Sequence, residues 1–76
     1  MYAIITKIDS TDITLVWSSE NSELTDGALV CQSESGVQTF DDITSEEHVL
    51  YQFDGELPED FDPATYSFVN GEFVKK

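Results

Sequence analysis

The chain has 76 residues, which makes one domain over residues 1–76, near the size at which a single core is just sufficient. Sixteen acidic residues against three lysines and no arginine give a formal net charge of −13 at pH 7. Such a surface repels nucleic acid and anionic membranes and attracts basic proteins, so nucleic acid and membranes are excluded as direct ligands. The hydrophobic content of 39% is too high for a disordered acidic tail, and we therefore expect a folded protein.

The N-terminal segment and the cysteine content favour a soluble intracellular protein. The first ten residues lack the basic region and the long apolar run of a signal peptide, and no stretch approaches the ~20 apolar residues that span a bilayer. A single cysteine, Cys31, cannot form an internal disulfide, which fits a reducing compartment.

The first forty residues predict a four-strand meander. Residues 2–8 and 13–17 are rich in β-branched side chains and are joined by a turn-like segment, so they predict a hairpin. Residues 18–26 are polar and predict a loop. Residues 28–32 and 37–40 then predict a third and a fourth strand.

Strict alternation along these strands predicts the core. It places Ile13, Leu15 and Trp17 on one side of the second strand. The complete predicted core is Ile4, Ile8, Ile13, Leu15, Trp17, Leu29, Cys31, Leu50, Phe68 and Phe73.

The segment from residue 41 to residue 53 supports two readings. Thr44 and Glu47 match a capping box, which predicts a short helical turn over residues 45–48, whereas residues 49–53 are strand-like. We expect the turn followed by a strand, and the alternative is a helix that continues to Gln52.

The C-terminal part predicts a second short turn and a hairpin. Asp62 before Pro63 resembles a helix N-cap, so residues 63–66 predict one helical or 3₁₀ turn. Residues 66–69 and 72–74 flank Asn70-Gly71, the strongest signal for a type I′ hairpin. The fold class expected is therefore β-rich α+β: a mostly antiparallel sheet of five to seven strands with one or two short helical turns.

Catalysis and metal binding find little support. Cys31 lies in an apolar run and predicts a small buried core residue, while His48, beside acidic residues, predicts a partly exposed side chain. Nothing brings the two together as a nucleophile and its base, and we expect no enzyme. The acidic residues 54–62 fail the EF-hand spacing, because Pro58, Glu59 and Thr65 occupy key positions. We therefore expect a solvated loop without metal or cofactor, and the alternative is a weak divalent-cation site.

A dense acidic segment remains. Between residues 41 and 62 nine acids meet no Lys or Arg: Asp41, Asp42, Glu46, Glu47, Asp54, Glu56, Glu59, Asp60 and Asp62. Duplex DNA carries one charge per about 1.7 Å, so nine carboxylates match about 15 Å of duplex. We interpret these acids as a partner-binding surface that imitates a nucleic-acid backbone, with Phe53 and Phe61 as apolar anchors. The alternative is that the acids only keep the protein soluble and that the phenylalanines are core residues.

The final third of the chain resembles the C-terminal end of many small bacteriophage-encoded proteins, in which a Leu-Pro-x-Asp-Phe stretch leads into a Tyr-x-Phe-Val-x-Gly-x-Phe-Val hairpin. The matching positions are Leu57, Pro58, Asp60, Phe61, Tyr66, Phe68, Val69, Gly71, Phe73 and Val74. These are hairpin and packing residues, and no catalytic role carries over. Phage DNA-mimic inhibitors (uracil-DNA glycosylase inhibitor, anti-restriction and anti-CRISPR proteins) are similar in size and acidity.

The resemblance implies a phage accessory protein with one of two roles. The first is a non-enzymatic inhibitor in the host cytoplasm, whose carboxylates imitate a nucleic-acid backbone and bind a basic, nucleic-acid-binding host protein. The alternative is a small structural or assembly component of a virion that packs against a larger virion protein.

Overall fold

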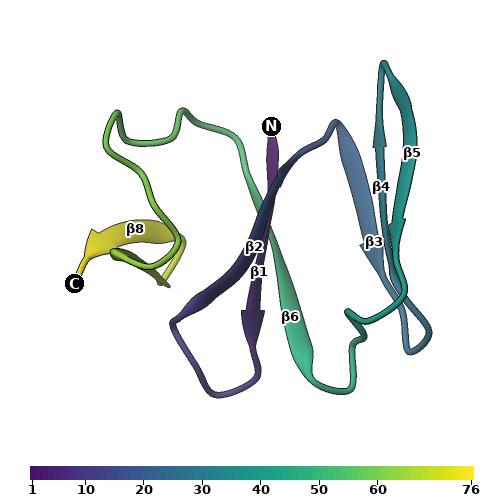
Figure 1. Ribbon diagram of the computed structural model, residues 1–76, viewed down its shortest axis with the longest axis horizontal. Coiled ribbons are helices and arrows are strands. Elements are labelled where there is room, and N and C mark those ends of the chain that lie inside the picture. The colour runs from purple at the N-terminus through teal and green to yellow at the C-terminus, as the bar shows by residue number, and fades with distance from the viewer.

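The computed structural model describes residues 1–76 and contains eight strands in three antiparallel sheets (Figure 1). The sheet orders are β2-β1-β6, β3-β4-β5 and β7-β8. The strands are β1 (Tyr2–Lys7), β2 (Ile13–Ser18), β3 (Asn21–Leu24), β4 (Leu29–Ser33), β5 (Gly36–Phe40), β6 (His48–Phe53), β7 (Tyr66–Val69) and β8 (Glu72–Lys75). The β-rich prediction is confirmed, but one sheet of five to seven strands is wrong, because the strands divide among three small sheets.

Strand β1 is the centre of the molecule and is buried on both faces. One face contributes Ala3 and Ile5 to a first core, and the other contributes Ile4 to a second core. The first core lies against the β3-β4-β5 sheet, and the second lies against the β7-β8 hairpin (Figure 1). The first core is Ala3, Ile5, Leu29, Cys31 and Ile43, and the second is Ile4, Ile13, Tyr66 and Phe68. Burial on both faces explains why β1 is a nearly continuous apolar run.

A β-bulge in β2 separates side chains that strict alternation places together. The register of β1 with β2 pairs Ile5 with Leu15 and Thr6 with Ile13, which leaves Thr14 without a partner. An extra residue on one strand reverses the facing of all side chains beyond it. Ile13 therefore enters the second core while Leu15 packs against the first, so the prediction of one shared face is wrong.

The predicted loop over residues 18–26 is also wrong, because it contains β3. The chain leaves the central sheet after β2 and turns into the second sheet at Ser19, which is buried. The Ser19 N–H donates to the Met1 carbonyl at 3.0 Å, and the Glu20 N–H donates to the Gln32 carbonyl at 2.8 Å. Strand β3 can be polar because it pairs with β4, and the buried residues Leu29 and Cys31 of β4 attach this sheet to the first core. The predicted four-strand meander is thus two separate hairpins, β1–β2 and β4–β5.

Neither predicted helical turn develops into a helix. Residues 44–48 form a single turn in which the His48 N–H donates to the Thr44 carbonyl at 3.0 Å, and β6 begins at His48. The Tyr66 N–H likewise donates to the Asp62 carbonyl at 3.1 Å immediately before β7. The alternative helix to Gln52 is wrong, because β6 pairs with β1 along its whole length. With no helix present, none is long and apolar enough to cross a membrane.

The C-terminal hairpin is confirmed. Val69 pairs with Glu72, and Asn70 and Gly71 between them have φ values of 52° and 84°. Positive φ at both central residues is the requirement of a type I′ turn, and asparagine and glycine adopt it at low cost.

The predicted core residues are buried or partly buried, with two exceptions. Ile8 is 45% exposed because it follows the last residue of β1 and enters the turn. Trp17 is 37% exposed and rests edge-on against Phe40, with ring centroids 5.1 Å apart. The buried members are Ile4, Ile13, Leu29, Cys31 and Phe68, and the partly buried members are Leu15, Leu50 and Phe73.

Candidate functional site

The nine acids of the predicted surface are all exposed, but the fold divides them into two groups. Strand β6 runs between the groups and contains no acid (Figure 1). With six residues at a rise of about 3.3 Å each, the ends of β6 lie about 17 Å apart. The β5–β6 acidic group is Asp41, Asp42, Glu46 and Glu47, and the β6–β7 acidic group is Asp54, Glu56, Glu59, Asp60 and Asp62.

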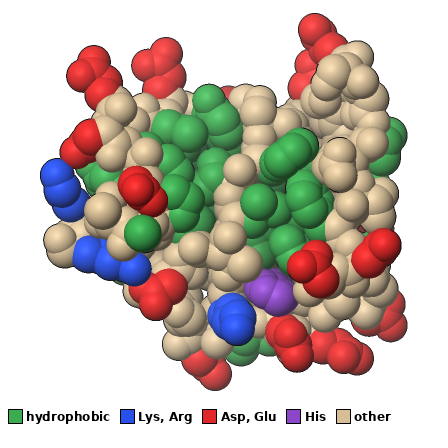
Figure 2. Space-filling view, in the orientation of Figure 1, with side chains coloured by type: hydrophobic (Ala, Val, Ile, Leu, Met, Phe, Trp, Pro, Cys, Tyr) green, Lys and Arg blue, Asp and Glu red, His purple; other side chains and the backbone are tan.

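The acids lie mainly around the rim of the molecule. In Figure 2 the red side chains surround the view, and hydrophobic side chains occupy its middle. The lysines lie at two places on the same rim. The charge predicted from sequence as one surface is therefore two separate exposed groups.

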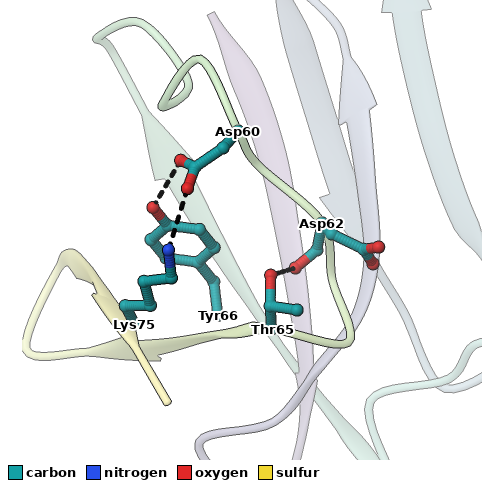
Figure 3. A network of polar contacts seen from close by, with 5 residues as sticks. All are labelled: Asp60, Asp62, Thr65, Tyr66 and Lys75. Atoms are coloured by element: carbon teal, nitrogen blue, oxygen red, sulfur yellow. Dashed lines mark hydrogen bonds and ion pairs between the residues drawn. The ribbon is translucent and has the colours of Figure 1, made fainter.

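Asp60 is the most constrained carboxylate of the β6–β7 acidic group (Figure 3). Its Oδ1 accepts a 2.7 Å hydrogen bond from the Tyr66 hydroxyl, and its Oδ2 accepts a 3.0 Å bond from the Lys75 ammonium. The bond from Tyr66 and then the bond from Lys75 lower the pKa of Asp60. The same bonds to Asp60 raise the pKa of Tyr66 and of Lys75. This carboxylate serves to fasten residues 54–62 to the C-terminal hairpin.

Asp62 has a local structural role. Its Oδ1 accepts a 2.9 Å bond from the Ala64 N–H, and its carbonyl accepts a 3.1 Å bond from the Thr65 hydroxyl. Asp62 therefore caps the turn, as its N-cap pattern in the sequence predicts. The seven other acids of the two groups form no ion pair and accept no side-chain hydrogen bond. They are Asp41, Asp42, Glu46, Glu47, Asp54, Glu56 and Glu59, and they are the free anionic groups of the candidate site.

Phe53 and Phe61 are half-buried members of an aromatic cluster. Their ring centroids lie 4.9 Å and 5.1 Å from that of Phe73, and both contacts are edge-to-face. Phe68 contacts Phe73 at 5.1 Å and completes the centre of the cluster. These ring contacts pack the acidic segment 54–62 against the hairpin, so Phe53 and Phe61 are partly occupied by packing within the protein.

The two residues considered for nucleophilic chemistry are both buried. Cys31 is 1% exposed in the first core, as predicted, and burial raises the pKa of its thiol while a hydrogen bond with Ser19 opposes the rise. His48 is 7% exposed, so the prediction of a partly exposed side chain is wrong. Its Nδ1 lies 3.3 Å from the Thr44 carbonyl, at the start of β6. No group of three or more His, Cys, Asp or Glu side chains is arranged to hold a metal ion.

A surface hollow lies away from the two acidic groups, where β2 leads into β3 beside the β4–β5 turn. Its volume is about 750 Å³. Its only signal in the sequence is the clustering of serines at Ser18, Ser19, Ser33 and Ser35. Its lining is Met1, Val16, Trp17, Ser18, Ser19, Glu20, Ser33, Glu34 and Ser35.

Comparison with known proteins adds no constraint on this site. No protein-family model, no curated protein and no solved structure significantly matches the chain.

Proposed function

We propose that the chain is a non-enzymatic inhibitor of the bacteriophage type that binds a basic, nucleic-acid-binding host protein in the host cytoplasm. Its carboxylates stand in for backbone phosphates. The observation that carries this function is the pair of exposed acidic groups that precede and follow β6 in the chain, with no Lys or Arg within the strand that separates them.

The number and span of the acids support mimicry. A duplex carries about ten charges over about 17 Å of its axis. The two acidic groups hold nine carboxylates and are separated along the chain by β6, whose ends lie about 17 Å apart; seven of the carboxylates have no internal partner. Duplex charge is continuous, whereas this charge has a neutral centre at β6. A partner with two cationic patches that normally contact phosphates at separate places therefore fits better than one with an unbroken basic groove.

The hydrogen bonds that hold the acidic segments in place also support mimicry. In the β5–β6 acidic group, Glu46 and Glu47 lie in the turn that the Thr44 carbonyl closes, and the β6–β7 group is attached to the hairpin through Asp60, Tyr66 and Lys75. A backbone that is already ordered lowers the conformational entropy that is lost when the partner binds, and the exposed charges favour fast, electrostatically steered association.

The test is capture of host proteins on the immobilised chain at low and high salt, with and without added duplex DNA. Mimicry predicts bound proteins that are basic, that are released by salt, and that DNA displaces. Capture that resists salt and is indifferent to DNA contradicts mimicry. It would favour the alternative role, a structural or assembly component of a virion.

Two matched variants give this test its control. The first neutralises the β5–β6 acidic group through D41N, D42N, E46Q and E47Q. The second removes the same four charges elsewhere, through E20Q, E23Q, D26N and E34Q. We expect the first to weaken binding by about tenfold or more and the second by much less, because charge pairs in contact contribute more than distant ones. Equal weakening by the two variants would show that only the net charge matters.

A further inference from the structure

Strand β5 is an edge strand that the rest of the molecule leaves uncovered. It is bonded only to β4, and four of its five residues are exposed, with Val37 at 65%. Alternate residues of an antiparallel edge strand direct their N–H and C=O groups outward. Outside the β4–β5 ladder, Val37, Gln38 and Thr39 make no hydrogen bond with any other part of the protein. The outer edge of β5 is therefore free to pair.

Each other sheet edge has a feature that opposes the addition of a strand. Strand β2 has its bulge at Thr14, and the residue just before it, Asp12, forms an isolated bridge with Ser67 of β7. Strands β3 and β6 border one another, and the Gln52 amide approaches the Ser22 carbonyl at 3.5 Å. Strand β8 begins with a glutamate and ends with a lysine. Bulges, cover and charge are the usual protections of an edge, and β5 has no bulge, no covering strand and no charged residue within Gly36–Phe40.

The charges at the two ends of β5 are all negative. The strand itself, Gly36–Phe40, contains no charged residue. Glu34 precedes it in the turn, and Asp41 and Asp42 follow it directly. We propose that β5 is a docking edge that takes an extended segment of a partner protein as an added strand, with uncharged β-branched residues in its middle and Lys or Arg at both ends. Main-chain pairing supplies the contact, and the end charges select the partner.

A second copy of this chain does not fit the same edge. Antiparallel pairing of two β5 strands about Gln38 sets Glu34 of each copy opposite Asp42 of the other. Like charges directly opposite each other destabilise a strand pair. Each copy also carries a net charge of −13, which adds long-range repulsion. The acids therefore oppose self-association in this register of the β5 edge.

This inference goes beyond the proposed function, because pairing at β5 requires no nucleic-acid site on the partner. The two share Asp41 and Asp42 only. A DNA-displaceable partner that leaves β5 unperturbed supports mimicry alone, and a peptide that pairs with β5 supports docking alone.

The experiment is an NMR titration of the whole chain with the synthetic peptide Lys-Lys-Thr-Val-Thr-Val-Thr-Lys-Lys. The control peptide Lys-Lys-Thr-Pro-Thr-Pro-Thr-Lys-Lys has the same charge, but its prolines remove two N–H donors and disfavour a strand. We expect amide shifts and slowed amide exchange at residues 36–40 with the first peptide. We expect the control peptide to bind at least about tenfold more weakly, a difference of about 1.4 kcal/mol. Equal binding of both peptides, or shifts confined to residues 54–62, would overturn the proposal.

Two valine variants locate the contact. Val37 and Val74 are both exposed on edge strands, at 65% and 46%, so V37K and V74K make the same change in charge at positions where folding tolerates it. We expect V37K to abolish binding of the peptide and V74K to leave binding unchanged. Both variants should retain the wild-type melting temperature. Equal effects of the two variants on binding would contradict docking at β5. Dimerisation of the wild-type chain that V37K abolishes would also contradict it, because the occupant would then be a second copy.

Discussion

The hydroxyl of Tyr66 donates a 2.7 Å hydrogen bond to the Asp60 carboxylate and so joins the first residue of β7 to the irregular acidic segment before it. Lys75, which pairs with Tyr66 across the hairpin, donates to the other oxygen of Asp60. One carboxylate thus connects residues 54–62 to both strands of the hairpin. The contact predicts a specific dependence of stability on pH.

We expect Tyr66→Phe to lower the melting temperature near neutral pH, because it removes the donor to Asp60 and keeps the ring. The pKa of Asp60 is lowered in the folded state, so its contribution is complete above the usual aspartate value, near 4, and is lost as pH falls through the lowered folded value. The pKa values of Tyr66 and Lys75 are raised, so their contributions hold below about pH 10 and are lost as pH rises through the raised values.

The measurement is thermal unfolding of wild type and Tyr66→Phe from pH 2 to pH 11. The difference between them should be largest in the middle of this range and should shrink at both ends. Tyr51→Phe makes the same chemical change at an exposed tyrosine outside the network and serves as the control. A pH-independent difference, or an equal effect of Tyr51→Phe, would contradict a role for the Asp60 charge.

Ile5→Ala should strongly destabilise the protein. Ile5 is completely buried in the first core, and deletion of a buried isoleucine side chain costs about 2–5 kcal/mol. Ile8→Ala is the matched control, because Ile8 is 45% exposed and the same substitution there should change stability by about 0.5 kcal/mol or less. Urea unfolding followed by Trp17 fluorescence measures both, and similar losses for the two variants would place Ile8 in the core.

Thr6→Val should stabilise the protein. The Thr6 side chain is 1% exposed, and its hydroxyl has no hydrogen-bond partner. Replacing an unsatisfied buried hydroxyl with a methyl group of similar shape removes a desolvation cost of about 1–3 kcal/mol. Thr14→Val, at an exposed position of β2, is the control and should have little effect. Destabilisation by Thr6→Val in urea unfolding would show that the hydroxyl has a partner in solution.

Gly71→Ala should weaken the C-terminal hairpin. Gly71 has a φ of 84°, a conformation that costs a residue with a Cβ atom about 1–2 kcal/mol. A Cβ atom there meets no neighbour, so the expected loss is due to backbone strain alone. Gly27→Ala is the control, because Gly27 does not have a left-handed φ and a Cβ atom there makes only an ordinary contact. Equal thermal unfolding of the two variants would contradict a strained turn.

Local features of the fold were predictable from the sequence because their causes lie within a few residues. The turn at Asn70-Gly71 follows from the positive φ values that these two residues adopt easily. The β1–β2 hairpin follows from two β-branched runs joined by a short turn. The burial of Cys31 follows from the apolar residues around it.

Non-local features were not predictable. The polar residues of β3 become a strand only because β4 is beside them. Pairing of β1 with β6 joins residues more than forty positions apart, and it excludes the helix that the capping box at Thr44 favours. The bulge at Thr14 reverses the facing of Ile13, and alternation in the sequence contains no signal for it.

The candidate site shows the same division. The sequence by itself determined that nine acids lie between residues 41 and 62 without a cation, since charge depends on composition alone. Only the tertiary structure decided that these acids form two groups, because β6 pairs with β1 and holds its two ends about 17 Å apart. It also decided that β5 is the open edge, since whether an edge is covered depends on how separate sheets pack against one another.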